Sequence, residues 1–268
     1  TEDAATALIK LIIDESFYYR GLGRNINLRY DDASSVYHSL EMNEYLKRSL
    51  TPYNDDLKSE ILRNGDTRSA LYIIPDTFPL IDIFFKAYPN LKLIKEIRHP
   101  IDFIYSCIKN GFGWRHENDP IAFHMVLEIN QVPIPWYALN WKEEYLSLAD
   151  VDRVIKSINY LQKLEIDVYN SMTDKQKQNI HIVRYEDLVE RTNETIELLC
   201  KFLDKKTLEG MPTVLARERV PKIIEVKERN EKAAFIKEKA TKKYYQIFVD
   251  MVEKYQEVKF NEQEIKLF

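Results

Sequence analysis

Residues 91–110 read LKLIKEIRHPIDFIYSCIKN, and the fold of the chain can be worked out from this stretch. The apolar run at 91–97 predicts a buried strand, and apolar residues at helical spacing follow at once. Arg98 ends the strand, and Pro100 suits a first helical turn, where a missing N–H costs nothing. Ligands of open α/β sheets bind at the carboxyl ends of the strands. Arg98, with the Ser106 hydroxyl two turns along the helix, therefore predicts an anion site best suited to phosphate.

An arginine in this position could instead be solvated, or could pair with Asp102. The stretch also resembles the nucleotide 3′-phosphate motif of the sulfotransferase family, a strand that ends in Arg-Asp-Pro and leads into a helix with a serine. Arg98, Pro100 and Ser106 match that motif, while His99 stands where the family usually has Asp.

Residues 180–184 predict another strand. At its end, VRYEDL at 183–188 resembles the family's Tyr-Glu-Asp-Leu strand end, and ETIELLCKFL resembles the helix that follows it. The resemblance covers about half of the chain and implies a parallel α/β sheet flanked by helices, with P-loop NTPase-like sulfotransferase architecture. We expect one domain over residues 1–268. The implied reaction moves a sulfuryl group from 3′-phosphoadenosine 5′-phosphosulfate (PAPS) to a hydroxyl of a small molecule or glycan, most readily a carbohydrate, and releases adenosine 3′,5′-bisphosphate (PAP).

By resemblance, Arg98 and Ser106 would hold the 3′-phosphate, and Tyr185 would lie near the nucleotide. A late basic loop of the family supplies a second phosphate cation, and Arg229 or Arg217 could do this within the basic, loop-like residues 208–232. A long helix is predicted after this loop, at 233–255. Thr1 could be the last residue of the family's 5′-phosphosulfate loop, which would put the first strand outside this sequence; alternatively, Thr1 is a plain N-cap.

The reaction also needs a general base that removes the proton from the hydroxyl of the acceptor. The apolar run ALYII at 70–74 predicts a third strand, and Asp76 follows it at a place where the family often has lysine. Asp76 could act as the base or could cap the next helix. His116 is a second candidate. It lies in the aromatic residues 111–151, which could form an acceptor-side insertion that stacks on sugar rings or the core of a helical cap.

The composition of the chain argues against several other classes of protein. The net charge of -4 implies no general affinity for nucleic acid, and six glycines leave no Walker or dinucleotide motif. We expect Cys107 and Cys200 to be reduced core residues. The sequence shows no metal-binding cluster, no signal peptide and no apolar run of membrane-spanning length, so we expect a cytoplasmic protein. The oligomeric state stays open.

Several alternatives also stay open. The chain could be a catalytically inactive family member that keeps the nucleotide fold, or another P-loop-like transferase such as a small-molecule kinase. Arg20, Arg24 and Arg29 could line an anionic groove or could be ordinary surface charges. Glu186 and Asp187 are expected to cap or pair locally.

Overall fold

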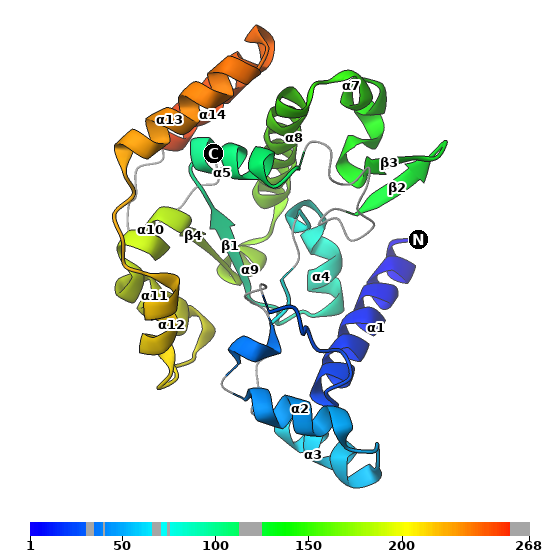
Figure 1. Cartoon of the computed structure of the whole chain (residues 1–268). Coiled ribbons are helices and arrows are strands. Elements are labelled where there is room, and N and C mark those ends of the chain that lie inside the picture. The colour runs from blue at the N-terminus through cyan, green and yellow to red at the C-terminus, as the bar shows by residue number, and fades with distance from the viewer. Residues whose placement is uncertain (31–34, 40, 66–70, 74–75, 113–124, 258–268) are drawn as a thin grey trace. The chain divides into compact units, whose positions relative to one another are not determined.

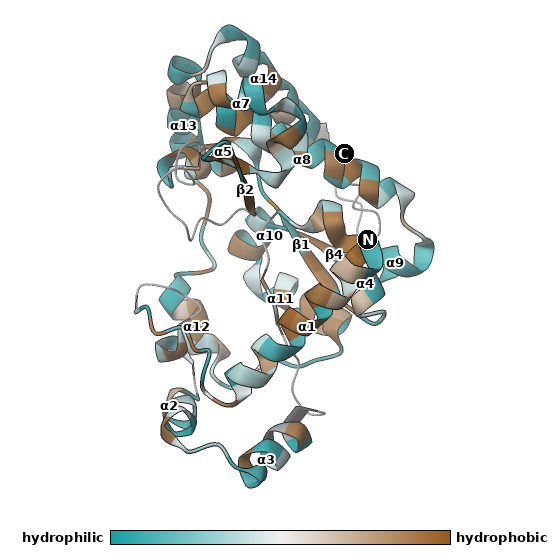
Figure 2. Cartoon of the chain, turned by 90° about the vertical axis from the view of Figure 1, so that its right-hand side faces the viewer, coloured by the Kyte–Doolittle hydropathy of each residue, from teal (hydrophilic) through white to brown (hydrophobic). Residues whose placement is uncertain are grey.

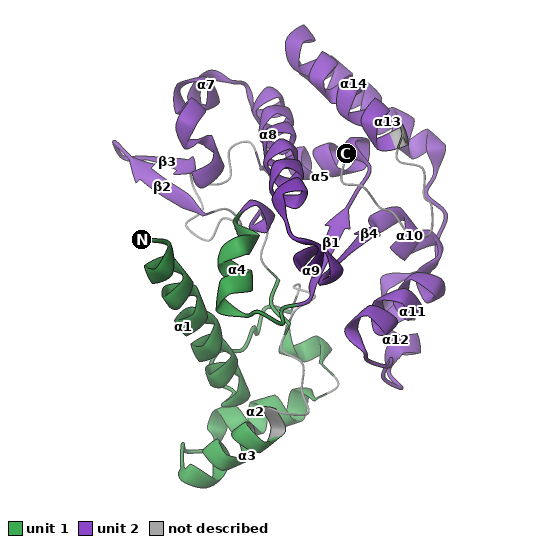
Figure 3. Ribbon diagram, turned by 180° about the vertical axis from the view of Figure 1, so that it is seen from behind, with its two compact units in different colours: residues 1–74, 80–91 green, residues 75–79, 92–268 purple. Residues whose placement is uncertain are grey.

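The computed structural model describes residues 1–30, 35–39, 41–65, 71–73, 76–112 and 125–257 (Figure 1). Contacts divide the chain into two compact units. Unit 1 comprises Thr1–Ile74 and Leu80–Leu91, and unit 2 comprises Pro75–Pro79 and Lys92–Phe268 (Figure 3). Our expectation of one domain over 1–268 stays a prediction.

The regular elements of unit 1 among the described residues are helical. Its elements are α1 (Glu2–Gly21), the 3-10 turn η1 (Val36–His38), α2 (Met42–Leu50), α3 (Asp55–Gly65) and α4 (Ile81–Ala87). The Tyr88 hydroxyl after α4 donates to Asp14 of α1 at 2.7 Å, and Lys86 pairs with Glu2. Gly23 has a φ of 70°, and a Cβ there would lie 2.7 Å from the Ser49 backbone N, so only glycine allows this close approach to α2.

Unit 2 contains a small parallel sheet. Strand β1 (Leu93–Ile97) pairs with β4 (Ile180–Arg184), and the register sets Ile97 opposite Arg184. Figure 2 shows hydrophobic residues in both strands, as expected for strands between helices. The predictions of strands at 91–97 and 180–184 are confirmed, with β1 two residues shorter.

The predicted strand at 70–74 is wrong for the residues that the structure describes. Residues 71–73 have no regular structure, and Leu71 and Ile73 are 75% and 78% exposed. A strand needs a partner for its backbone hydrogen bonds, and these residues pair with no described strand.

Most of the core of unit 2 lies between four helices, α5 (Pro100–Lys109), α8 (Asp150–Ser171), α13 (Val226–Lys239) and α14 (Lys242–Glu257). Buried residues from all four meet there, including Ile104, Ile155, Ile236 and Phe248. Cys107 is buried in this core as a free thiol, and Cys200 is free and half-buried.

The C-terminal part is more helical than predicted. Helix α12 (Met211–Glu218) and the start of α13 fall within the expected loop at 208–232. The single helix expected at 233–255 is divided near Thr241, whose backbone N–H donates to the buried Asp152 carboxylate at 2.9 Å. This bond replaces an intrahelical partner, so a new helix begins there.

A second, smaller core surrounds the hairpin of β2 (Val126–Ile129) and β3 (Val132–Pro135). Asn130 and Gln131 both have positive φ, the backbone of a two-residue type I′ turn. The remaining elements of unit 2 are the 3-10 turn η3 (Trp136–Trp141), α7 (Lys142–Ser147), α9 (Asp174–Gln178), α10 (Tyr185–Glu190) and α11 (Thr192–Leu203).

Candidate functional site

The junction between β1 and α5 is built around His99. Helix α5 begins at Pro100, and the Nδ1 atom of His99 accepts the Ile101 N–H at 3.3 Å, so His99 is the N-cap. Burial and the nearby Arg229 cation lower the pKa of His99 to about 4. The ring is therefore neutral at pH 7 and keeps the lone pair that the cap needs. His99 thus caps the helix at the position where the family motif has Asp, a residue type that is also a preferred N-cap.

Arg98 lies beside Tyr185 at the ends of the two paired strands. The Arg98 guanidinium carbon is 4.3 Å from the centre of the Tyr185 ring, a cation–π contact. The Arg98 Nε atom is buried, and it has no hydrogen-bond partner in the part of the chain that the structure describes. An unsatisfied buried donor is costly in an empty site and is an observation that fits an anionic ligand.

Arg98 and Asp76 line the same cavity, which has a volume of about 100 Å³. Lys95 also lines this cavity, but its ammonium is paired with Glu165 at 2.5 Å. Asp76 has a φ of 53°, a strained backbone conformation that is common at functional sites. The cavity thus brings together Asp76 and Arg98, two residues proposed for the site from sequence.

Asp102 does not pair with Arg98, so that alternative is wrong. The Asp102 carboxylate accepts hydrogen bonds at 2.9 Å from Arg229 Nε and from Lys232 Nζ. Burial alone would raise the pKa of Asp102, but the hydrogen bonds from Lys232 and Arg229 outweigh it and hold that pKa below its usual value. The structure thus places Arg229, our candidate phosphate cation, against the first turn of α5.

Ser106 lies one turn further along α5 than Asp102, so the two share a side of the helix. The Ser106 hydroxyl accepts a hydrogen bond from Asn110 Nδ2 at 3.3 Å. It does not line the Arg98 cavity. Ser106 and the Arg229–Asp102 pair therefore form a second group of polar side chains on adjacent turns of α5.

Glu186 pairs locally with Arg184 at 3.8 Å, as expected, and also makes contacts that the sequence did not indicate. It is buried, and its two carboxylate oxygens accept from the His99 N–H at 2.9 Å and from the Tyr255 hydroxyl at 2.6 Å. It thereby joins β1, α10 and α14. The prediction for Asp187 is confirmed, since it pairs with Arg191 four residues on. In the sequence, the only indication of these contacts is that Glu186 lies just beyond the end of a strand.

The remaining residues proposed from sequence are Thr1, His116 and the aromatic side chains of 111–151. Thr1 is the N-cap of α1, where its hydroxyl accepts the Ala4 N–H at 3.3 Å; its assignment to a donor loop stays a prediction. His116 lies outside the described residues. In the described part of 111–151, Tyr137 and Tyr145 are buried in the small core, which favours the helical-cap alternative for these two rings.

Clusters of metal-ligating side chains and long apolar helices would indicate other kinds of site in the described residues. No group of three or more His, Cys, Asp or Glu side chains among them is arranged to hold a metal ion. None of the helices among them is sufficiently long and apolar to cross a membrane.

A family model described as the sulfotransferase domain matches residues 81–262, about two thirds of the chain. The chain belongs to the sulfotransferase domain family. The family match includes both stretches that carried the resemblance, so Arg98, Ser106, Tyr185 and Arg229 lie inside the sulfotransferase domain, while Thr1 and Asp76 precede it. No curated protein and no solved structure gives a significant match.

Proposed function

We propose that this sulfotransferase moves a sulfuryl group from PAPS to a hydroxyl of a small molecule or glycan, with carbohydrate as the acceptor class. Arg98, Ser106 and Arg229 hold the 3′-phosphate around the first two turns of α5, and Tyr185 supports Arg98. A P-loop-like placement of the donor is part of the same proposal.

The observation that carries the proposal is the state of Arg98. Its guanidinium is oriented by the Tyr185 ring, and its buried Nε lacks a hydrogen-bond partner in the described part of the protein. A phosphate oxygen would satisfy that donor with a charge-assisted bond, and arginine suits phosphate because its donors form a rigid fork. The start of α5 adds the positive end of a helix dipole.

Arg229 can serve the same anion without leaving Asp102. Its Nε and Nη2 atoms face the Asp102 carboxylate, with the Nη2 contact at 2.7 Å. Apart from this ion pair, the buried Nη2 atom has no hydrogen-bond partner among the described residues, so it can also donate to a ligand.

When bound, PAPS supplies the sulfuryl group; the chain's residues position it and neutralise its charge, which is how enzymes catalyse group transfers of this kind.

Asp76 is our candidate base for the acceptor's proton. The cavity of about 100 Å³ has room for a phosphoryl group but not for a whole nucleotide, because ligand pockets usually exceed about 300 Å³. This cavity therefore cannot hold the 3′-phosphate and the reacting sulfuryl group together, and the role of Asp76 as the base competes with phosphate binding at Arg98.

The test is calorimetric titration with PAP and with 5′-AMP, which lacks the 3′-phosphate. We expect the protein to prefer PAP by about tenfold or more, and Arg98→Gln to abolish this preference, since a charge-assisted bond is worth about 1.5–3 kcal/mol. Arg191→Gln, which removes a similar charge at the end of α10, should leave it unchanged. Preference for ATP over PAP would refute the proposal and favour the kinase alternative.

Transfer is then measured with radiolabelled PAPS and a panel of glycans. Loss of transfer in Asp76→Asn with unchanged PAP affinity would support its role as the base. Tighter PAP binding in Asp76→Asn would instead mean that the carboxylate merely repels the phosphate. PAP binding without transfer by the unmodified protein would favour the catalytically inactive alternative.

A further inference from the structure

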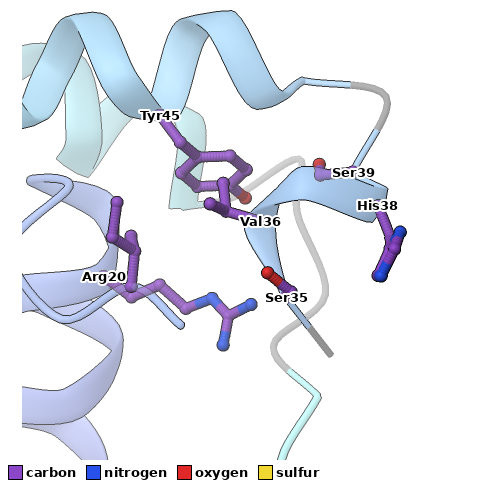
Figure 4. Close-up of a pocket in the computed structure, with 7 residues that line it drawn as sticks. Arg20, Ser35, Val36, His38, Ser39 and Tyr45 are labelled. Atoms are coloured by element: carbon purple, nitrogen blue, oxygen red, sulfur yellow. The ribbon is translucent and has the colours of Figure 1, made fainter. Parts of the chain in front are cut away.

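Unit 1 has a cavity of its own, separate from the site described above. Its volume is about 200 Å³, and it is lined by residues from the end of α1, from the following loop, from η1 and from α2: Arg20, Ile26, Ser35, Val36, His38, Ser39 and Tyr45 (Figure 4). None of these lining residues is acidic, so Arg20 gives the cavity a positive charge.

Arg20 differs from Arg24 and Arg48 in having no partner among the described residues. The Arg24 guanidinium donates to the backbone carbonyls of Ser49 and Thr51, and Arg48 pairs with Glu60 at 3.0 Å. The Arg20 guanidinium has no hydrogen bond or ion pair among the described residues. Figure 4 shows it extending toward Ser35 and η1. Of the three arginines proposed from sequence to line an anionic groove, only Arg20 lines this cavity.

Two hydroxyl groups can supplement this cation. The Tyr45 hydroxyl has no hydrogen-bond partner in the described structure, and its ring lies on the same side of η1 as Arg20 (Figure 4). The Ser39 hydroxyl accepts the Glu41 N–H at 3.1 Å, which leaves its own O–H free to donate. Ser35 is different, because its hydroxyl already donates to the Asn27 carbonyl and accepts from Tyr37 N–H.

The rest of the lining sets the size and shape of the ligand. Ile26 and the buried Val36 provide an apolar surface beside the donors. A cavity of about 200 Å³ is below the range of about 300–1,000 Å³ that holds drug-sized ligands, so a nucleotide is too large for it. A single six-membered ring with one charged substituent matches the space and the mixture of apolar and donor groups.

We propose that this cavity binds a small organic oxyanion of monosaccharide size, with a carboxylate or a sulfate ester as the charged group. The Arg20 fork binds two oxygens of that group side by side, as arginine does with carboxylates. The hydroxyl groups of Tyr45 and Ser39 donate to the lone pairs of the charged group that Arg20 leaves unoccupied. Ile26 and Val36 contact the apolar side of the ring. The binding reaction is independent of the proposed sulfuryl transfer.

The two apolar lining residues make a site-specific experiment possible. The full chain is labelled at its isoleucine and valine methyl groups, and the methyl NMR signals of Ile26 and Val36 are followed during titration to tens of millimolar, a range suited to weak binding. The ligands are glucuronate, glucose as the same ring without the carboxylate, and inorganic sulfate as the anion without a ring. We expect glucuronate to shift both signals saturably, sulfate to shift them more weakly, and glucose to leave them in place.

The variants separate a specific site from general attraction to positive charge. Arg20→Gln should weaken glucuronate binding by about tenfold or more, and Tyr45→Phe by several-fold, since each removes donors to a charged group. Arg63→Gln removes the same charge from α3 and should have no effect. Since Arg20 is exposed and holds no other residue in place, its variant should keep the wild-type methyl spectrum. Equal shifts from glucose and glucuronate, no shift from either anion, or unchanged affinity in Arg20→Gln would each overturn the proposal.

Discussion

Replacing His99 with asparagine should remove one specific part of the protein's acid sensitivity. Burial and the Arg229 cation hold the pKa of folded His99 at about 4, whereas a histidine in an unfolded chain has a pKa of about 6.5. Between these values the unfolded chain binds a proton that the folded protein does not bind. The folded pKa is the lower one, so the free energy of unfolding decreases as the pH falls from about 6.5 to about 4.

The magnitude follows from the gap between the two pKa values. A gap of about 2.5 units, at about 1.4 kcal/mol for each unit, sets an upper limit of about 3 kcal/mol below pH 4. At pH 5 about 2 kcal/mol of this should already be lost, and at pH 7 almost none. Part of this loss of stability has a structural cause, because a proton on His99 Nδ1 would break the hydrogen bond that caps α5.

The assay is urea unfolding of the wild type and of His99→Asn at pH 7 and at pH 5. Asparagine is also a good N-cap but does not titrate, so the two proteins should differ by less than about 1 kcal/mol at pH 7. Between pH 7 and pH 5 the variant should lose about 2 kcal/mol less than the wild type. His181, whose pKa is also lowered by burial, contributes equally to both proteins and cancels in the comparison. Parallel pH dependences would refute the reasoning.

Three further predictions concern the neighbouring charges. Asp102→Asn should lower the free energy of unfolding by about 2–3 kcal/mol at pH 7, because it leaves Arg229 and Lys232 without their shared carboxylate; an unchanged urea midpoint would contradict this. Since the pKa of folded Asp102 is lowered, its contribution is lost as the pH falls below about 4, so the wild type and Asp102→Asn should converge in stability in acid. Tyr255→Phe should cost about 1–2 kcal/mol in thermal unfolding at pH 7, because the buried Glu186 carboxylate loses a donor, and a variant as stable as the wild type would argue against that bond.

The two strands of the parallel sheet could be predicted because their signals are local. Each is a short apolar run that ends at a charged residue and leads directly into a helix start. Residues 70–74 show a similar run, yet 71–73 are exposed and irregular in the structure. Whether such a run becomes a strand depends on a neighbouring strand, which the run itself does not specify.

The contact between Arg98 and Tyr185 could also be inferred from sequence. Two motifs at the carboxyl ends of parallel strands meet at one edge of the sheet, and the register that pairs Ile97 with Arg184 brings the next residues together. The role of Arg229 could be proposed only by resemblance. Its partner Asp102 lies 127 residues away, and such a distant pairing depends on how α13 packs against α5.

The identity of residue 99 bears on the charge of the proposed phosphate site. An aspartate at this N-cap would place a permanent negative charge at the start of α5, close to Asp102 and Glu186. His99 also caps the helix, and because its pKa is about 4 it is neutral at pH 7. The positive end of the α5 dipole is then not neutralised by its own cap. A chain that departs from the family's Arg-Asp-Pro pattern in this way therefore keeps a more positive environment around Arg98, and the substitution is compatible with binding a phosphate there.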